Sequence, residues 1–279
     1  MTGFPRPELL ATTDWLAGEL GRHDVRILDC RWRPDGSAAQ VYAAGHIPGA
    51  LHLDWAADLV DREDSGVLTL AGSERVAAVL SRLGIGDGGP VVLYDDTLGL
   101  YASRAWWSLR AYGLESARVL DGGYPAWTDE SRPISNELVR PEPASFTPRA
   151  NPRLRLVAAD VRAVLGSLDV TLLDARAPAE FRGHEGNTRR LGHIPGAINV
   201  PVGAMIQPGS QLLRDGAQLR DQLQRAGVIR GRRLVCYDGS GVGAARLVFI
   251  LALLGFEDTA VYDGGWAEWG DRLDLPVER

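Results

Sequence analysis

The segment Asp238–Ala244 has the composition of a ligand-binding loop. It reads D-G-S-G-V-G-A and follows the apolar run Leu234–Tyr237, which predicts a turn between a strand and a helix. Backbone amides that lead into a helix N-terminus carry partial positive charge and converge on one point, which suits an anion or a thiolate. The lead residue, Asp238, is instead a carboxylate, and the nearest thiol, Cys236, lies two positions back. A purely structural turn is the alternative interpretation.

Composition narrows the class of protein. The chain has 279 residues, 45% of them hydrophobic, which is enough for two domains with full cores. A net charge of −6 and a pI near 5.4 argue against a nucleic-acid partner. Two cysteines cannot build a zinc site or a disulfide scaffold, which favours a reducing compartment. No signal-like or membrane-spanning run is found, so we expect a cytoplasmic protein without a membrane partner, a metal or another cofactor.

The chain contains two copies of one unit. Four motifs recur in the same order at an offset of 142 to 147 residues, which predicts a tandem duplication. The pairs are GHIPGA at 45–50 and 192–197, ILDCR at 27–31 and LLDAR at 172–176, VVLYD at 91–95 and LVCYD at 234–238, and VLDGGYPAW at 119–127 and VYDGGWAEW at 261–269.

The copies are separated by a proline-rich stretch. Five prolines between Pro133 and Pro152 favour an extended connector over a helix. We therefore predict an N-terminal domain over residues 1–140, a linker over residues 141–153 and a C-terminal domain over residues 154–279.

Within each copy, short apolar runs alternate with helix-length segments. The runs at 25–30, 90–95 and 117–122 predict strands, and the amphipathic segment at 72–84 predicts a helix. This alternation predicts an α/β fold in which each domain has a mainly parallel sheet with helices on both faces. Ligands of such sheets bind beyond the carboxyl ends of strands, where Asp95 and Asp238 both lie.

Together these motifs resemble the tandem-domain rhodaneses, the thiosulfate and 3-mercaptopyruvate sulfurtransferases, over nearly the whole chain. The resemblance implies a catalytically silent N-terminal copy, in which an aspartate such as Asp95 is expected. It also implies a C-terminal copy with a cysteine at the head of its loop. Mercaptopyruvate-type loops read C-G-S-G-V-T-A, so here Asp238 replaces the cysteine and Gly243 replaces the threonine.

The missing cysteine bears directly on the chemistry that the resemblance implies. In the family, a thiolate attacks a sulfane sulfur and holds it as a persulfide until a thiophilic acceptor takes it. Asp238 cannot form a persulfide. We expect the loop amides to lower its pKa and keep it ionised, so that a fixed charge fills the nest and repels anions. Cys236 and Cys30 are predicted to pack as small apolar residues.

The resemblance also assigns candidate site residues. Asp238 occupies the position of the nucleophile, and Ser240 and His46 match residues that assist proton transfer in mercaptopyruvate-type members. The substrate-binding candidates are the loop residues and three arginines of the segment before the second GHIPGA motif: Gly239, Gly241, Val242, Gly243, Ala244, Arg182, Arg189 and Arg190.

Each of these assignments has a structural alternative. His46 and its counterpart His193 are also typical of hydrogen bonds within a turn, and the arginines are typical of a solvated loop. Glu180 stands where vertebrate members carry an arginine. Five tryptophans are predicted to fill the core and the domain interface: Trp106, Trp107, Trp127, Trp266 and Trp269.

Two functional hypotheses follow from the resemblance. The first is a sulfurtransferase that moves sulfur from thiosulfate or 3-mercaptopyruvate to an acceptor such as cyanide or a thiol, impaired by Asp238. The second is a catalytically inactive binding or regulatory module, whose partner would be a small ligand or another protein. Phosphatase-like hydrolysis is disfavoured, because related phosphatases use a longer loop and also need a cysteine.

Overall fold

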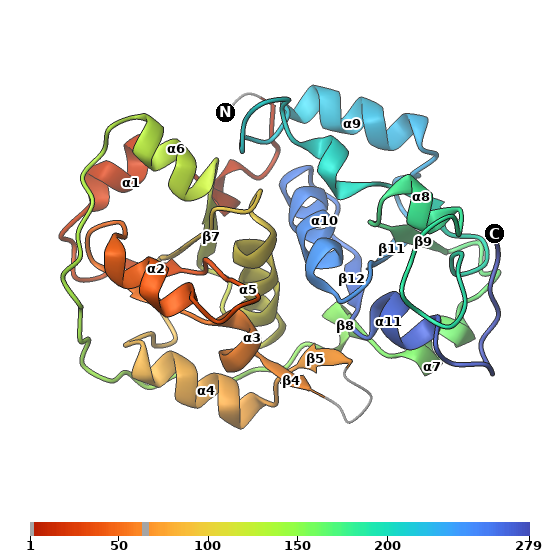
Figure 1. The fold of residues 1–279 in the computed structure, drawn as a ribbon, viewed down its shortest axis with the longest axis horizontal. Helices are drawn as coiled ribbons and strands as arrows, with labels where there is room; N and C mark the ends of the chain where they lie inside the picture. The colour runs from red at the N-terminus through yellow and green to blue at the C-terminus, as the bar shows by residue number, and fades with distance from the viewer. Residues whose placement is uncertain (1–2, 63–66) are drawn as a thin grey trace.

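The computed structural model describes residues 3–62 and 67–279, and the N-terminal half is built on a five-stranded parallel sheet (Figure 1). The strand order is β1-β7-β6-β2-β3. The strands are β1 (Leu10–Ala11), β2 (Arg26–Asp29), β3 (Ala50–His52), β6 (Val91–Tyr94) and β7 (Ala117–Leu120). The predicted strands at 25–30, 90–95 and 117–122 are thus confirmed as β2, β6 and β7.

The C-terminal half repeats this sheet in the order β10-β9-β11-β12-β8, again parallel throughout. The strands are β8 (Arg155–Leu156), β9 (Val170–Asp174), β10 (Ile198–Asn199), β11 (Arg233–Tyr237) and β12 (Thr259–Tyr262). Register also repeats: Leu28 pairs with Leu51 in one sheet, and the equivalent residues Leu173 and Ile198 pair in the other. The duplication predicted from the motifs is confirmed.

Helices cover both faces of each sheet, as predicted. Adjacent residues of a strand face opposite sides: Leu28 packs in a cluster with Val76 of α4, whereas Ile27 packs with Leu16 of α1 and Trp127 of α6. The helices of the N-terminal half are α1 (Thr13–Glu19), α2 (Ala38–Ala44), α3 (Trp55–Asp58), α4 (Ser73–Arg82), α5 (Leu100–Ala111) and α6 (Gly123–Asp129). Those of the C-terminal half are α7 (Ala158–Ala163), α8 (Pro178–Phe181), α9 (Gly216–Arg225), α10 (Val242–Leu253) and α11 (Gly265–Trp269). A short antiparallel hairpin, β4 (Val60–Arg62) with β5 (Leu68–Leu70), stands apart from both sheets.

The predicted connector is extended, and its backbone is hydrogen-bonded to the N-terminal half. Residues 130–151 contain no helix or strand, and their backbone is tied to the N-terminal half. Ala144 donates to the carbonyl of Ser81 at 3.2 Å, and Asn151 donates to that of Ala111 at 2.8 Å. The connector therefore crosses the first domain before the second sheet begins at β8.

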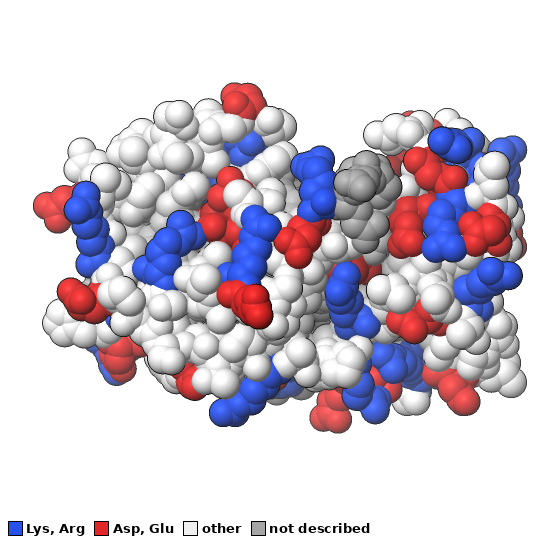
Figure 2. Space-filling model, turned by 90° about the horizontal axis from the view of Figure 1, so that it is seen from below, with Lys and Arg blue, Asp and Glu red and all other residues white. Residues whose placement is uncertain are grey.

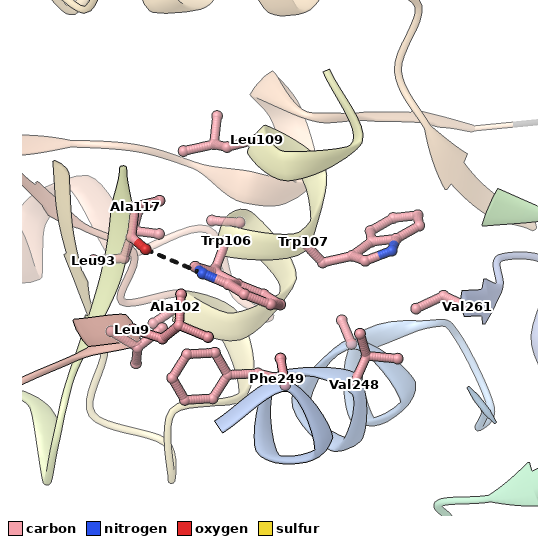
Figure 3. Close-up of a cluster of buried hydrophobic side chains, with 14 of the residues drawn as sticks. Leu9, Leu93, Ala102, Trp106, Trp107, Leu109, Ala117, Val248, Phe249 and Val261 are labelled. Atoms are coloured by element: carbon pink, nitrogen blue, oxygen red, sulfur yellow. Dashed lines mark hydrogen bonds between the residues drawn. The ribbon is translucent and has the colours of Figure 1, made fainter. Parts of the chain in front are cut away.

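The two halves meet along helices α5 and α10, which lie side by side in Figure 1. Figure 3 shows Trp106 of α5 against Phe249 of α10, with ring centroids 5.0 Å apart and planes nearly perpendicular. The Trp106 indole donates to the carbonyl of Ala117 at 3.1 Å. All five tryptophans predicted to be buried are less than 5% exposed, which confirms that expectation.

A buried polar cluster also joins the halves. The Arg104 guanidinium of α5 donates to the carbonyl of Gly241 at 3.3 Å and lies 2.8 Å from a carboxylate oxygen of Asp263. The other Asp263 oxygen lies 2.9 Å from Arg155 and accepts the amide of Leu70. Because Arg104 and Leu70 come from one half and Asp263 from the other, this cluster fixes the halves against each other.

The counterparts of Arg104 and Asp263 also contact the other half. Arg246 of α10, the counterpart of Arg104, donates to the hydroxyl of Ser103 at 3.2 Å. Asp121, the counterpart of Asp263, accepts the amide of Leu213 at 3.3 Å. Both copies therefore contribute an arginine and an aspartate to the interface, but of these two pairs only Arg104 and Asp263 form an ion pair within the described residues.

Charged side chains of both signs mix on the molecular surface. On the face shown in Figure 2, arginines and acidic side chains lie interspersed; the sequence contains no lysine. None of the helices in the described ranges is both long and apolar enough to span a bilayer.

The Arg104–Asp263 pair should contribute strongly to stability. Replacing Arg104 with Met leaves a buried carboxylate with one cation fewer, so we expect a loss of about 3 kcal/mol in the free energy of unfolding. Arg225→Met, which breaks an exposed pair with Asp221, should change it by less than about 0.5 kcal/mol. Urea denaturation measures both; equal effects would contradict a special role for the buried pair.

Candidate functional site

The glycine-rich loop lies between the carboxyl end of β11 and the start of α10, as predicted. Asp238 follows the last strand residue, and its side chain turns back into the loop. One carboxylate oxygen accepts the amide of Gly241 at 2.5 Å, and the other accepts that of Gly243 at 2.9 Å. The amide nest is therefore occupied by a side chain of the loop itself.

Glycine is required at position 241 for two reasons. Its φ of +83° lies in the left-handed region, which side chains other than glycine rarely adopt. A Cβ there would also lie 2.6 Å from a guanidinium nitrogen of Arg104. Gly99 in the N-terminal half has the same conformation and the same close approach, from Arg246. Each loop is thus held by an arginine of the other half.

Asp95 forms the same arrangement in the N-terminal half. One of its oxygens accepts the amides of Thr97 and Gly99, at 2.8 and 2.9 Å, and the other accepts that of Ala102 at 2.8 Å. Asp95 is 1% exposed, whereas Asp238 is only partly buried and borders a cavity. In both loops the lead aspartate accepts backbone amides through both oxygens. The two aspartates differ in their exposure to the cavity.

The direction of the Asp238 pKa corrects our expectation. We predicted that the loop amides lower it, but burial raises the pKa of the Asp238 carboxyl above its ordinary value. Hydrogen bonds from Gly243, Gly241 and Ala244, and the charge of Arg104, oppose that rise only in part. For this carboxyl, the cost of removing the charge from water therefore outweighs the hydrogen bonds from the amides.

The cavity beside Asp238 has a volume of about 830 Å³ and lies between the two halves. Its C-terminal wall includes Asp238, Ser240 and Glu180, together with the loop residues Gly239, Val242 and Gly243. Gly241 and Ala244 do not line it, although the Gly241 amide holds Asp238 in place. The structure therefore brings most of the predicted loop residues to one cleft.

Aromatic side chains form the opposite wall, and our reading of the sequence missed them. Trp32, Trp55 and Tyr101 all come from the N-terminal half and line the cavity. They pack with Val242 of the loop in one cluster that bridges the halves. Each follows the carboxyl end of a strand, β2, β3 or β6, which is the signal that could have located them.

The two histidines lie outside this cavity. His46 is fully buried, with its ring nitrogens 2.9 Å from the carbonyl of Tyr42 and 3.2 Å from that of Glu137. His193 lies 2.9 Å from the carbonyl of Phe181 and stacks on that ring. This placement matches the structural alternative, and a proton-transfer role for His46 stays an untested prediction.

The three predicted arginines are also absent from the described lining of the cavity. Arg190 donates to four carbonyls of the C-terminal segment, including that of Leu275 at 2.6 Å, and so anchors that segment. Arg182 and Arg189 are exposed, and the backbone amide of Arg189 donates to Asp271 at 2.7 Å. Two other arginines, Arg62 and Arg176, do line the cavity, and neither was among the predicted residues.

Both thiols are enclosed. Cys236 and Cys30 have no exposed surface and belong to the apolar core, as predicted. Burial raises the pKa of both thiols far above the ordinary value, which disfavours the reactive thiolate. Neither sulfur lines the cavity.

The enclosure of the thiols predicts slow chemical labelling. We expect the native protein to react with a thiol-specific disulfide reagent only through rare opening of the core, whereas the denatured chain should release both thiols at once. Time-resolved absorbance of the released reagent measures this. Rapid labelling of one thiol in the native protein would contradict the placement of Cys236.

The raised pKa of Asp238 predicts a pH-dependent stability difference. Compared with Asp238→Asn, the wild type should lose stability as pH rises from about 4 through the raised folded-state pKa, and the difference should then level off. Each tenfold increase in the proton affinity of the folded-state carboxyl corresponds to a loss of about 1.4 kcal/mol. Urea denaturation of both proteins across this pH range measures it. A difference that instead grows in favour of the wild type would restore our original expectation.

Comparison with known proteins identifies this architecture. The Rhodanese-like domain family matches the chain twice, over residues 12–130 and 157–272. A Mycobacterium tuberculosis relative named "Putative thiosulfate sulfurtransferase SseB" is 40% identical over 286 residues, which cover 98% of each chain.

Solved structures agree with the sequence comparison. The crystal structure of SseA from Escherichia coli, a 3-mercaptopyruvate sulfotransferase, aligns with a TM-score of 0.83 at 30% identity and covers 92% of this chain and 98% of that one. An anaerobic ergothioneine biosynthesis enzyme from Chlorobium limicola, in complex with trimethyl histidine, aligns at 0.85 and 25% identity, with coverage of 100% and 72%. The chain therefore belongs to the rhodanese family of sulfurtransferases, as a tandem member with two rhodanese-like domains.

Proposed function

We propose that this rhodanese-family chain does not transfer sulfur from thiosulfate or 3-mercaptopyruvate and instead binds a small ligand in the cleft beside Asp238. The observation that carries the proposal is the pair of hydrogen bonds from Gly241 and Gly243 to the Asp238 carboxylate. The nest in which a persulfide would lie already holds a group that cannot accept sulfur. The cavity in front of it remains large enough for a small organic ligand.

The remaining thiols support this proposal. Sulfur transfer by the family route needs a thiolate that can reach the donor. Cys236 and Cys30 are enclosed in the core, and burial raises the pKa of each thiol. A carboxylate oxygen has no stable product with sulfane sulfur, so no described group in the cleft replaces the cysteine.

Ligand binding in this cleft is supported by the cavity beside Asp238 and by one relative. The Chlorobium limicola enzyme is in complex with trimethyl histidine, which is neither thiosulfate nor mercaptopyruvate. Related cores therefore accept organic ligands. The second candidate function, sulfur transfer by another route, would depend on Cys236 as the nearest thiol.

The unmodified chain should produce negligible thiocyanate from either donor. Ordinary enzymes turn over on the order of 10 times per second, and we expect at least a thousandfold less here. The measurement is a thiocyanate assay with thiosulfate or 3-mercaptopyruvate and cyanide. Ordinary turnover would overturn the proposal, and its abolition by Cys236→Ser would identify the nucleophile.

Asp238→Cys should restore sulfur uptake. The substitution places a thiol among the amides of Gly241 and Gly243, which lower thiol pKa values, and removes the carboxylate from the nest. We expect the variant to gain the mass of one sulfur atom and to release it to cyanide. 3-Mercaptopyruvate should be the better donor, since Gly239 and Ser240 stand where thiosulfate-type members carry cations.

Asp95→Cys is the matched control for this gain. It places a thiol in the equivalent nest of the N-terminal half, which is 1% exposed and does not line the cavity. We expect no sulfur uptake by this variant, with its fold checked by thermal denaturation. Uptake by Asp95→Cys, or a folded Asp238→Cys that takes up no sulfur, would show that the nest and cavity do not determine reactivity.

A further inference from the structure

We propose that the chain has a second ligand site, in a cavity at the far end of helices α5 and α10 from the cleft beside Asp238, and that this site binds a small organic carboxylate. The cavity shares no lining residue with the cleft, so this inference does not depend on the proposed function. It is carried by the apolar lining of the cavity and by two neighbouring arginines, Arg6 and Arg110.

The two cavities are lined by opposite ends of the same pair of helices. Tyr101, in the first turn of α5, and Val242, the first residue of α10, line the cleft beside Asp238. Later residues of both helices line the second cavity: Trp106, Trp107, Arg110, Val248 and Ala252. Figure 3 shows Trp106, Trp107 and Val248 where the helices meet. A ligand in the second cavity would therefore contact both halves of the chain without entering the cleft.

The lining of the second cavity is mainly apolar. Besides the four apolar residues of the two helices, it includes Leu154 and Phe256. These two are partly exposed, whereas Trp106 and Trp107 are almost fully buried, so the cavity extends from the surface to the contact between the helices. Its volume is about 210 Å³. An apolar cavity of roughly 150 Å³ can bind benzene, so the size suits an apolar body of about one ring.

Arg110 brings a mostly buried cation to this apolar lining. Its guanidinium lies over the Trp106 ring, 4.8 Å from the centroid. Its ion pair within the described chain is with Glu115, at 2.9 Å, and that carboxylate is 62% exposed to water. An exposed partner compensates a buried charge only weakly. A guanidinium that stacks on a ring keeps its in-plane N–H groups for hydrogen bonds, so Arg110 remains able to bind a further anion.

Arg6 places a second guanidinium beside the first. Its backbone amide donates to the carbonyl of Leu253 at the end of α10, at 3.1 Å, and its side chain pairs with the exposed Glu8 at 2.9 Å. Burial lowers the pKa of Arg110, Glu115 raises it, and the charge of Arg6 lowers it further. The two guanidiniums therefore repel each other across the lining, and an anion between them would relieve that repulsion.

The remaining polar residues of the lining leave a positive balance. Glu257 is exposed and contributes one negative charge against the two guanidiniums, and Thr259 is uncharged. Carboxylates and phosphates both suit arginine pairs. The mainly apolar lining favours the organic carboxylate, because its body also buries apolar surface, which inorganic phosphate lacks.

Calorimetry with matched probes tests the inference. We titrate the full chain with benzoate, with benzamide, which has the same ring and a similar shape but no charge, and with inorganic phosphate, which has charge but no apolar body. We expect benzoate to bind at least about tenfold more tightly than either. Equal affinity for benzamide or for phosphate, or no binding of benzoate at millimolar concentration, would overturn the inference.

Substitution of arginines locates the site of benzoate binding. Arg110→Met keeps a long side chain but removes the guanidinium, and we expect it to weaken binding about tenfold. Arg118→Met is the matched control, since the Arg118 guanidinium also lies over an indole ring, that of Trp15, but does not line the cavity. Full binding by Arg110→Met, or an equal loss in Arg118→Met, would contradict the assigned site.

Two further variants test the sign of the charge and the choice of cavity. Glu257→Gln removes the exposed carboxylate of the lining and should tighten benzoate binding about twofold to threefold. Tyr101→Leu alters the wall of the other cleft and should leave benzoate binding unchanged. Unchanged or weaker binding by Glu257→Gln, or loss of binding in Tyr101→Leu, would overturn the inference. Thermal denaturation confirms that each variant remains folded before its affinity is compared.

Discussion

The arrangement of the molecule depends on a reciprocal exchange of arginines between its two halves. Arg104 of the N-terminal half contacts the carbonyl of Gly241 and the carboxylate of Asp263 in the C-terminal half. Arg246 of the C-terminal half lies close to Gly99 in the N-terminal half. A buried guanidinium is tolerated only where its partners stay in place. The loops, the helices that carry the arginines and the cleft between the halves are therefore held together, which is why residues of the N-terminal half can form a wall of the cavity.

An arginine of the other half approaches each loop, yet of the two lead aspartates only Asp238 lines the described cavity. The N-terminal loop has one residue more between its aspartate and its left-handed glycine, and Asp96 in that loop forms an ion pair with Arg33. The amide of Leu98 in the same loop donates to the side chain of Gln211 from the other half, at 2.6 Å. Asp95 beside these contacts is 1% exposed, whereas Asp238 lines the cavity. Loop length and its covering contacts, rather than the lead carboxylate, distinguish the two copies.

Much of the fold could be predicted because the sequence motifs of one domain occur twice in the chain. Repeated motifs identified the two copies and the strands that end just before Asp95 and Asp238, and the position of Cys236 within one of these apolar runs predicted its enclosure. The direction of the Asp238 pKa could not be predicted, since it depends on how much packing surrounds a loop whose amides act the other way. The aromatic wall was missed for a related reason. A sequence gives residue types, but which half supplies a wall depends on how the halves dock.

An aspartate at position 238 is compatible with the rhodanese fold because its carboxylate accepts hydrogen bonds from the loop amides. Without a carboxylate at position 238 and without a bound anion, the amides of Gly241 and Gly243 would lack acceptors. Each buried donor without a partner is destabilising by about 1–3 kcal/mol. Asp238 satisfies both from within the chain. Because its amides already have an acceptor, the loop does not need a bound anion for its stability. The ligand preference of the cavity in front of the loop is then determined by the other side chains that line it. Those groups are aromatic rings on one side and carboxylates on the other.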